Sequence, residues 1–93
     1  MVSPYEVRSP MKRWRLIDVL INEEDWSLAV GDWDFDRVLA CRWNGDAEHP
    51  KGNPVSRGEP TWFVLPSELV EAILEIVPNE KKALAKALFK AAA

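Results

Sequence analysis

The feature that most constrains the fold of this chain is the segment from Asn44 to Pro60. It holds three prolines and three glycines within seventeen residues. Because proline lacks a backbone N–H and has a fixed φ, this segment cannot form a helix or a central strand. Strand-like runs flank it, Arg37–Trp43 before and Thr61–Leu65 after. The sequence therefore predicts two strands joined by a long polar loop, which at this length is either functional or disordered.

The residues before this unit predict two more strands. Arg13–Ile21 is rich in β-branched and aromatic side chains and is apolar at both alternating sets of positions. A strand of this kind is covered on both faces or lies at the seam of a dimer. Trp26–Gly31 alternates regularly between apolar and small or polar residues, which is typical of a half-buried strand.

Two helices are expected after the last strand. Ser67 is a suitable N-cap for the first helix, acidic residues follow it, and Pro78 ends it. Asn79 caps a second helix that runs to about Lys90. We therefore predict an α+β fold, with a four-stranded antiparallel β-meander followed by two C-terminal helices (ββββαα).

The chain is expected to form a single domain over residues 1–93. Within it, residues 1–11 are predicted to be a flexible arm, 12–66 the sheet and 67–93 a helical hairpin. A homodimer is also expected, because the sheet has two edges and five tryptophans exceed what one small core absorbs.

Composition excludes several classes of protein. The net charge of -3 argues against non-specific nucleic-acid binding. A single cysteine excludes an intrachain disulfide and suits a reducing compartment. No apolar run approaches the roughly 20 residues of a membrane span, and the N-terminus lacks the apolar core of a signal peptide. We therefore expect a cytoplasmic protein without membrane association.

No residue pattern predicts catalysis or metal binding. Aspartates alternate in the turn 32–36 like the first ligands of a calcium loop, but Arg37 and Trp43 replace its required glycine and glutamate. His49, the only histidine, lies in the long loop, whereas Cys41 lies within a strand on its apolar side. The sequence therefore predicts no catalytic residue, no metal and no cofactor.

One face of the predicted sheet has the composition of a nucleic-acid surface. If Leu39 and Phe63 face the helices, then Arg42 and Trp62 face away from them. Single-stranded nucleic acid binds to such surfaces through its backbone charge and through base stacking. The residues of this hypothesis are Arg13, Arg15, Arg42, Lys51, Arg57 and Trp62. The alternative is that Trp62 packs against the arm or a second subunit and that the arginines pair with nearby acids.

A family resemblance points to the same function. Its features are the Arg42–Trp43 strand end, the loop ending in Arg57, the strand at Thr61–Leu65 and the helix start at Ser67. In this order they resemble the positive-cofactor-four domain of transcriptional coactivators. That family forms a four-stranded antiparallel sheet followed by a helix, dimerises, and binds single-stranded DNA on its sheet. The resemblance implies that Lys51 and Arg57 contact the nucleic-acid backbone and that Trp43 and Trp62 stack on bases.

A second hypothesis of a different class uses the turn from Asp32 to Asp36. Its aromatic residues Trp33 and Phe35 alternate with acids, which suits an exposed hot spot for a protein partner. The sequence therefore predicts a small non-enzymatic binding module for single-stranded nucleic acid, and the alternative is an acidic, tryptophan-rich protein-interaction or inhibitor module that uses this turn.

Overall fold

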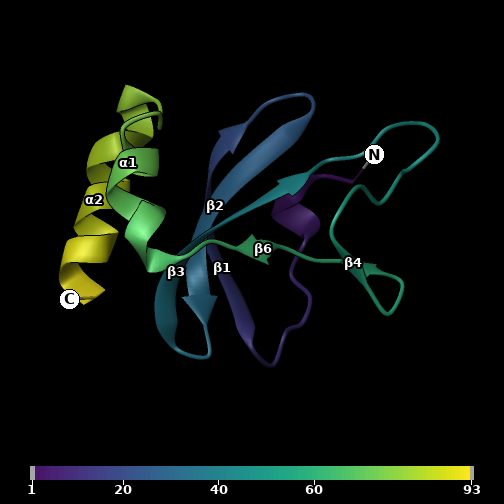
Figure 1. The fold of residues 1–93 in the computed structure, drawn as a ribbon, viewed down its shortest axis with the longest axis horizontal. Coiled ribbons are helices and arrows are strands. Elements are labelled where there is room, and N and C mark those ends of the chain that lie inside the picture. Colours follow the sequence, from purple (N-terminus) through teal and green to yellow (C-terminus); the bar gives the residue numbers. More distant parts are fainter. Residues whose placement is uncertain (1, 93) are drawn as a thin grey trace.

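The fold is α+β, and the computed structural model describes residues 2–92 (Figure 1). The long strands are antiparallel neighbours, and a very short one completes the four-stranded sheet in the order β1-β2-β3-β6. A separate two-stranded sheet, β4-β5, lies within the loop that precedes β6. The elements are η1 (Pro4–Glu6), β1 (Trp14–Asn22), β2 (Trp26–Trp33), β3 (Asp36–Trp43), β4 (Val55–Ser56), β5 (Glu59–Pro60), β6 (Phe63–Val64), η2 (Ser67–Leu69), α1 (Val70–Leu74) and α2 (Asn79–Ala92).

The structure confirms an antiparallel four-stranded sheet followed by two helices, but it differs from a simple meander. The segment 44–60 is not strand-free, because Val55–Ser56 pairs with Glu59–Pro60 across a two-residue turn. Arg57 and Gly58 in that turn both have positive φ, of 53° and 81°, as tight hairpin turns require. The predicted strand at Thr61–Leu65 contributes only two paired residues, Phe63 and Val64.

The sheet separates two hydrophobic cores. The larger core lies between the sheet and the helices and contains Leu28, Val30 and Leu39 from the strands. Leu74 and Ala85 contribute to it from the two helices. Figure 1 shows the helix pair on one side of the sheet and the N-terminal segment on the other. The helices thus cover the face that the alternation of β3 predicted.

The second core lies on the opposite face and explains why β1 is apolar on both sides. Trp14, Trp62 and Ala40 pack there against Val7 of the N-terminal segment. Gly31 leaves room for the Trp14 indole, because a Cβ at this position would lie 2.4 Å from the ring. Both faces of β1 are therefore covered within one chain, and this pattern does not require a dimer seam.

The N-terminal segment is not the flexible arm that the sequence predicts. Residues 1–11 were expected to be a flexible arm, yet the segment folds onto the sheet, and Met1 alone of these lies outside the described residues. The side chain of Val7 is 1% exposed, and Pro4 within η1 is buried. Burial of Val7 against the sheet gains more than the freedom of a loose arm, so the segment is part of the fold.

The outer edge of β1 is blocked by side chains. Two register shifts, between Leu16 and Asp18 and between Val19 and Ile21, interrupt its regular pairing with β2. The Val19 N–H donates to Asp18 Oδ1 at 2.8 Å, and Lys81 Nζ donates to the Val19 carbonyl at 2.6 Å. Bulges and charged side chains of this kind prevent another strand from adding to an edge.

The two helices form a short hairpin with complementary charges. The first begins as the 3₁₀ turn η2 and continues as only five residues of α1. Glu75 lies between Lys82 and Lys86 of α2, at 3.9 and 3.2 Å. Among residues 2–92, no helix has both the length and the apolar character that a membrane crossing needs.

Candidate functional site

The sheet face that the sequence proposed for nucleic acid is covered in the structure. Trp62 faces away from the helices as predicted, but its side chain is only 7% exposed. Its Nε1 donates to the Val7 carbonyl at 2.7 Å, and its ring lies 6.2 Å from that of Trp14. The expectation of an uncovered indole at Trp62 is therefore wrong, because the N-terminal segment packs over it. The position of Trp62 instead matches the alternative stated above, in which its side chain packs against the N-terminal segment.

Arg42 is also buried, at 3% exposure, and it organises the long loop. Its guanidinium donates to the carbonyls of Lys51 and Pro54, which precede the β4-β5 hairpin in the chain, and of Thr61, which follows it. Only its Nε finds no acceptor among residues 2–92. Burial lowers the pKa of Arg42. The side chain is thus a tether for the loop, and the expectation that it contacts a ligand strand from an exposed face is wrong.

The remaining basic residues of the nucleic-acid hypothesis lie in two separate regions. Arg13 and Arg15 lie beside the β2–β3 turn, where both line a shallow pocket with Phe35. Lys51 and Arg57 are exposed residues of the long loop, and Lys51 Nζ donates to a loop carbonyl, that of Gly58. Because Arg42 and Trp62 are buried, they do not join the two regions into one exposed surface.

The β2–β3 turn presents one aromatic side chain fully to solvent. Asp34 and Phe35 connect the paired residues Trp33 and Asp36, and they have positive φ values of 49° and 74°. Positive φ at both central residues is characteristic of a type I′ hairpin turn. Phe35 is 100% exposed. The turn therefore presents an aromatic ring at its tip with none of its surface buried against the rest of the molecule.

Arg13 contacts two residues of this turn, Asp34 and Trp33. Its Nε donates to Asp34 Oδ1 at 3.0 Å, and its guanidinium lies 4.7 Å from the centre of the Trp33 ring. The hydrogen bond from Arg13 holds the pKa of the Asp34 carboxyl below its usual value. Trp33 itself is half-buried and packs on the second core, so it supports the turn, while Phe35 alone is freely exposed.

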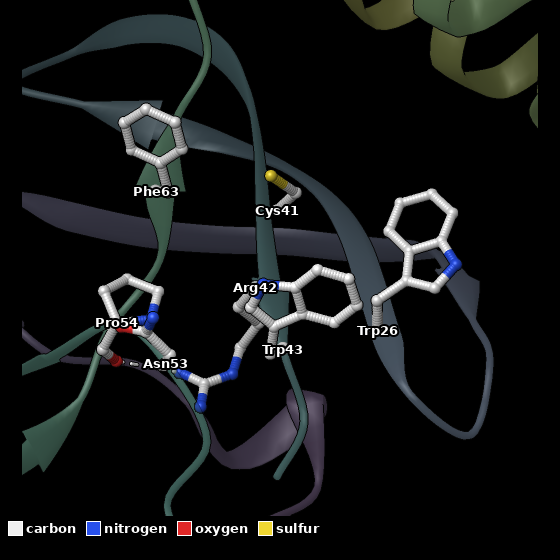
Figure 2. A pocket seen from close by; sticks show the side chains of 7 residues that line it. All are labelled: Trp26, Cys41, Arg42, Trp43, Asn53, Pro54 and Phe63. Carbon is white, nitrogen blue, oxygen red and sulfur yellow. Dashed lines mark hydrogen bonds between the residues drawn. The ribbon is translucent and has the colours of Figure 1, made fainter.

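A second candidate surface lies at the other end of the same hairpin. Figure 2 shows the rings of Trp26, Trp43 and Phe63 arranged around Cys41. They line an apolar pocket of about 380 Å³, with Arg42, Asn53 and Pro54 completing its wall. Trp43 is 60% exposed and Phe63 is 59% exposed. Burial raises the pKa of the Cys41 thiol, which keeps it protonated and unreactive at neutral pH.

The long loop forms one wall of this pocket because it returns to the end of β3. Trp43 N–H donates to the Asn53 carbonyl at 2.8 Å, and Asn53 N–H donates back to the Trp43 carbonyl at 3.1 Å. Gly52 permits this approach, since its φ is +64° and a Cβ there would lie 2.1 Å from the Trp43 carbonyl oxygen. The loop is therefore built onto the strand end and fixes the wall of the pocket.

Sequence reasoning placed Phe63 on the helix-covered face and did not foresee this pocket. The side of the sheet was correct, because Phe63 pairs with Cys41 and shares its face. However, α1 has only five residues and does not extend over this end of the sheet. The helix that the sequence predicts to end at Pro78 ends instead at Leu74, and no helix-breaking residue marks this earlier end.

Comparisons with known proteins give no identification. No family model matches the chain, and no curated protein or solved structure matches it significantly. The resemblance to the positive-cofactor-four domain stays a prediction. Within residues 2–92, no group of three or more His, Cys, Asp or Glu side chains is arranged to hold a metal ion.

Proposed function

We propose that this chain is a non-enzymatic protein-interaction module that inserts Phe35 into an apolar pocket of a partner protein. The observation that carries the proposal is the conformation of Phe35 at the tip of the β2–β3 turn. It is a bulky residue with a φ of 74°, fully exposed and without packing contacts.

Phe35 lowers the stability of the unbound protein, because its strained backbone is not compensated by packing of its side chain. Type I′ turns strongly favour Asn-Gly at the two central positions, because a side chain with positive φ crowds its own backbone. The strain of a left-handed residue is about 1–2 kcal/mol. Such strain in a rigid, exposed turn is typical of a recognition element, where binding and not folding selects the residue.

The surroundings of Phe35 hold it ready for binding. Arg13 clamps Asp34 in the turn and covers the half-buried ring of Trp33. A preorganised loop loses little conformational entropy when a partner binds it. An aromatic side chain on such a loop has the properties of a binding hot spot, which is a large apolar area on a fixed support.

The test is photo-crosslinking from the turn in cells that express the protein. We replace Phe35 by p-benzoylphenylalanine and, as a control outside both candidate surfaces, Ile76, which is 61% exposed. We expect position 35 to yield a covalent partner adduct that position 76 does not yield. The Phe35→Gly variant, which keeps the fold, should fail to co-purify that partner.

Two results would count against the proposal. A Phe35→Gly variant that retains the partner would show that the aromatic ring is not required. Absence of any adduct from position 35, with a normal circular dichroism spectrum, would show that the turn faces only solvent. An adduct of two copies of the chain would identify the partner as a second subunit.

A further inference from the structure

Trp43 lines a second pocket in addition to the apolar one. This second pocket, of about 540 Å³, is formed by the β1–β2 turn and the start of the long loop. Its lining includes Asp25, Asp46 and His49 together with Trp43. An apolar pocket and an acidic pocket therefore share one exposed indole, and they lie at the end of the β2–β3 hairpin opposite Phe35.

The acidic turn is fixed beside Trp43 by a buried asparagine. Asn44 is 2% exposed, and its Nδ2 donates to the Glu23 carbonyl at 2.8 Å. Its backbone N–H donates to the Asp25 carbonyl at 2.8 Å, and Ser27 Oγ donates to its Oδ1 at the same distance. The carboxylate of Asp25 is thus carried on a backbone that is held in place before any ligand arrives.

Most carboxylates at this end have no ion-pair partner within residues 2–92. Glu23, Glu24 and Asp25 form none, whereas Asp46 Oδ1 lies 3.3 Å from His49 Nδ1. Asp46 Oδ1 accepts the N–H groups of Glu48 and His49, which hold its pKa below the usual value. Asp25 and Asp46 therefore place exposed carboxylates in the pocket that Trp43 lines, whereas the nearby Arg42 guanidinium is buried and bonded to loop carbonyls.

These features define the chemistry of an occupant. A cation over the face of a tryptophan is attracted by the ring quadrupole, and adjacent carboxylates strengthen that attraction. The apolar pocket on the neighbouring side of Trp43 accepts an aliphatic or aromatic side chain. Phosphate groups of a nucleic acid would meet the unpaired carboxylates and be repelled.

We propose that the Trp43 surface docks a peptide segment of a partner protein in which Lys or Arg adjoins an apolar residue. The basic side chain lies over Trp43 beside Asp25 and Asp46. The apolar side chain occupies the pocket between Trp43 and Phe63. This site is separate from Phe35, so variants of the two can be tested independently.

The test begins with selection from a random dodecapeptide phage library on the immobilised protein. We expect enriched sequences to place Lys or Arg next to an aliphatic or aromatic residue. The same selection on a Trp43→Thr variant should give no such enrichment. Thr is chosen because it suits a strand, and Phe63→Thr serves as a second variant should Trp43→Thr lose its circular dichroism spectrum.

Affinity measurements with the enriched peptide then separate the two pockets. By fluorescence anisotropy, Trp43→Thr should weaken binding by about tenfold or more and Asp25→Asn by roughly three- to tenfold. Glu80→Gln, an exposed carboxylate on α2 outside both pockets, should leave affinity unchanged.

Three outcomes would overturn the proposal. The first is enrichment of peptides without a basic residue, and the second is no enrichment above that on Trp43→Thr. The third is a concentration-dependent dimer, seen by sedimentation equilibrium, that Trp43→Thr abolishes. In that case a second copy of the chain occupies the surface.

Discussion

At the scale of single residues, Phe35 and Trp62 show that exposure does not follow from residue type. Trp62, the larger aromatic side chain, is buried beneath the N-terminal segment, whereas Phe35 is fully exposed to solvent. The difference comes from position: Trp62 lies in the middle of a covered face, while Phe35 lies at the tip of a two-residue turn. The energetic consequences of these positions can be measured separately.

Phe35→Gly should stabilise the free protein. Glycine adopts positive φ without steric cost, so we expect the free energy of unfolding to rise by about 1 kcal/mol, which urea denaturation monitored by circular dichroism would measure. Phe35→Ala serves as the control, because it keeps the Cβ and should remain close to wild type. A loss of stability in Phe35→Gly would show that Phe35 makes packing contacts in solution.

The Arg13–Asp34 pair predicts a specific pH dependence. The pKa of Asp34 is lowered in the folded state, so the pair contributes stability above the ordinary aspartate value of 3.8 and loses it as the pH falls through the lowered pKa. An NMR titration of the Asp34 carboxyl should give a midpoint below 3.8. In Arg13→Gln that midpoint should move back upward. An unchanged midpoint would mean that the pair does not form in solution.

At the scale of elements, the long loop shows how one buried cation can order a segment rich in proline and glycine. Arg42 extends from β3 and donates to three loop carbonyls, of which that of Pro54 also accepts the Thr61 N–H at 3.0 Å. The backbone bridge between Trp43 and Asn53 then closes the loop against the strand end. The wall of the apolar pocket therefore depends on a side chain that is itself hidden from solvent.

Arg42→Met should loosen this loop while leaving the helices intact. The variant removes the guanidinium donors to the partly buried carbonyls of Lys51 and Thr61, so we expect a loss of roughly 2–3 kcal/mol in the free energy of unfolding. Hydrogen exchange should also become faster at the amides of Trp43 and Asn53. Arg57→Met, an exposed arginine of the same loop, should change stability by no more than about 0.5 kcal/mol. Unaltered exchange in Arg42→Met would show that the bridge closes the loop alone.

At the scale of the whole molecule, the sheet has a core on each face. The helices cover one face, and residues before β1 cover the other. Trp14 and Trp62 lie in the second core, which accounts for two of the five tryptophans without a second subunit. Dimerisation therefore stays a prediction, and the number of tryptophans alone does not require it.

Removal of residues 1–8 should expose the second core. Val7 leaves its site, and the Trp62 Nε1–H loses its acceptor, the Val7 carbonyl. We expect tryptophan fluorescence to shift to longer wavelength and the unfolding free energy to fall by about 2 kcal/mol or more. Tyr5→Ala, at a residue that is half-exposed, is the control and should change little. A truncated protein with unchanged stability would show that the segment does not pack on the sheet in solution.

The sequence predicted the elements better than it predicted what covers them. The alternation of the predicted strands Arg37–Trp43 and Thr61–Leu65 correctly placed Leu39 toward the helices and Trp62 away from them. The burial of Trp62 was missed because the short proline-containing segment that carries Val7 has no periodic pattern, and that of Arg42 because its partners are loop carbonyls. The apolar pocket between Trp43 and Phe63 was missed because the length of the helices decides how much of this sheet face they cover, and the strand pattern does not give that length.

The contact between Lys81 and Val19 joins the final helix to the outer edge of the first strand. During synthesis, β1 emerges long before Lys81, so its outward carbonyl at Val19 remains open until the chain has been made through α2. Until then only the bulges and Asp18 of β1 hinder pairing of this edge with other unfinished chains. The last helix therefore adds the final contact that covers the edge, and Lys81→Ala should aggregate more readily during refolding at high concentration.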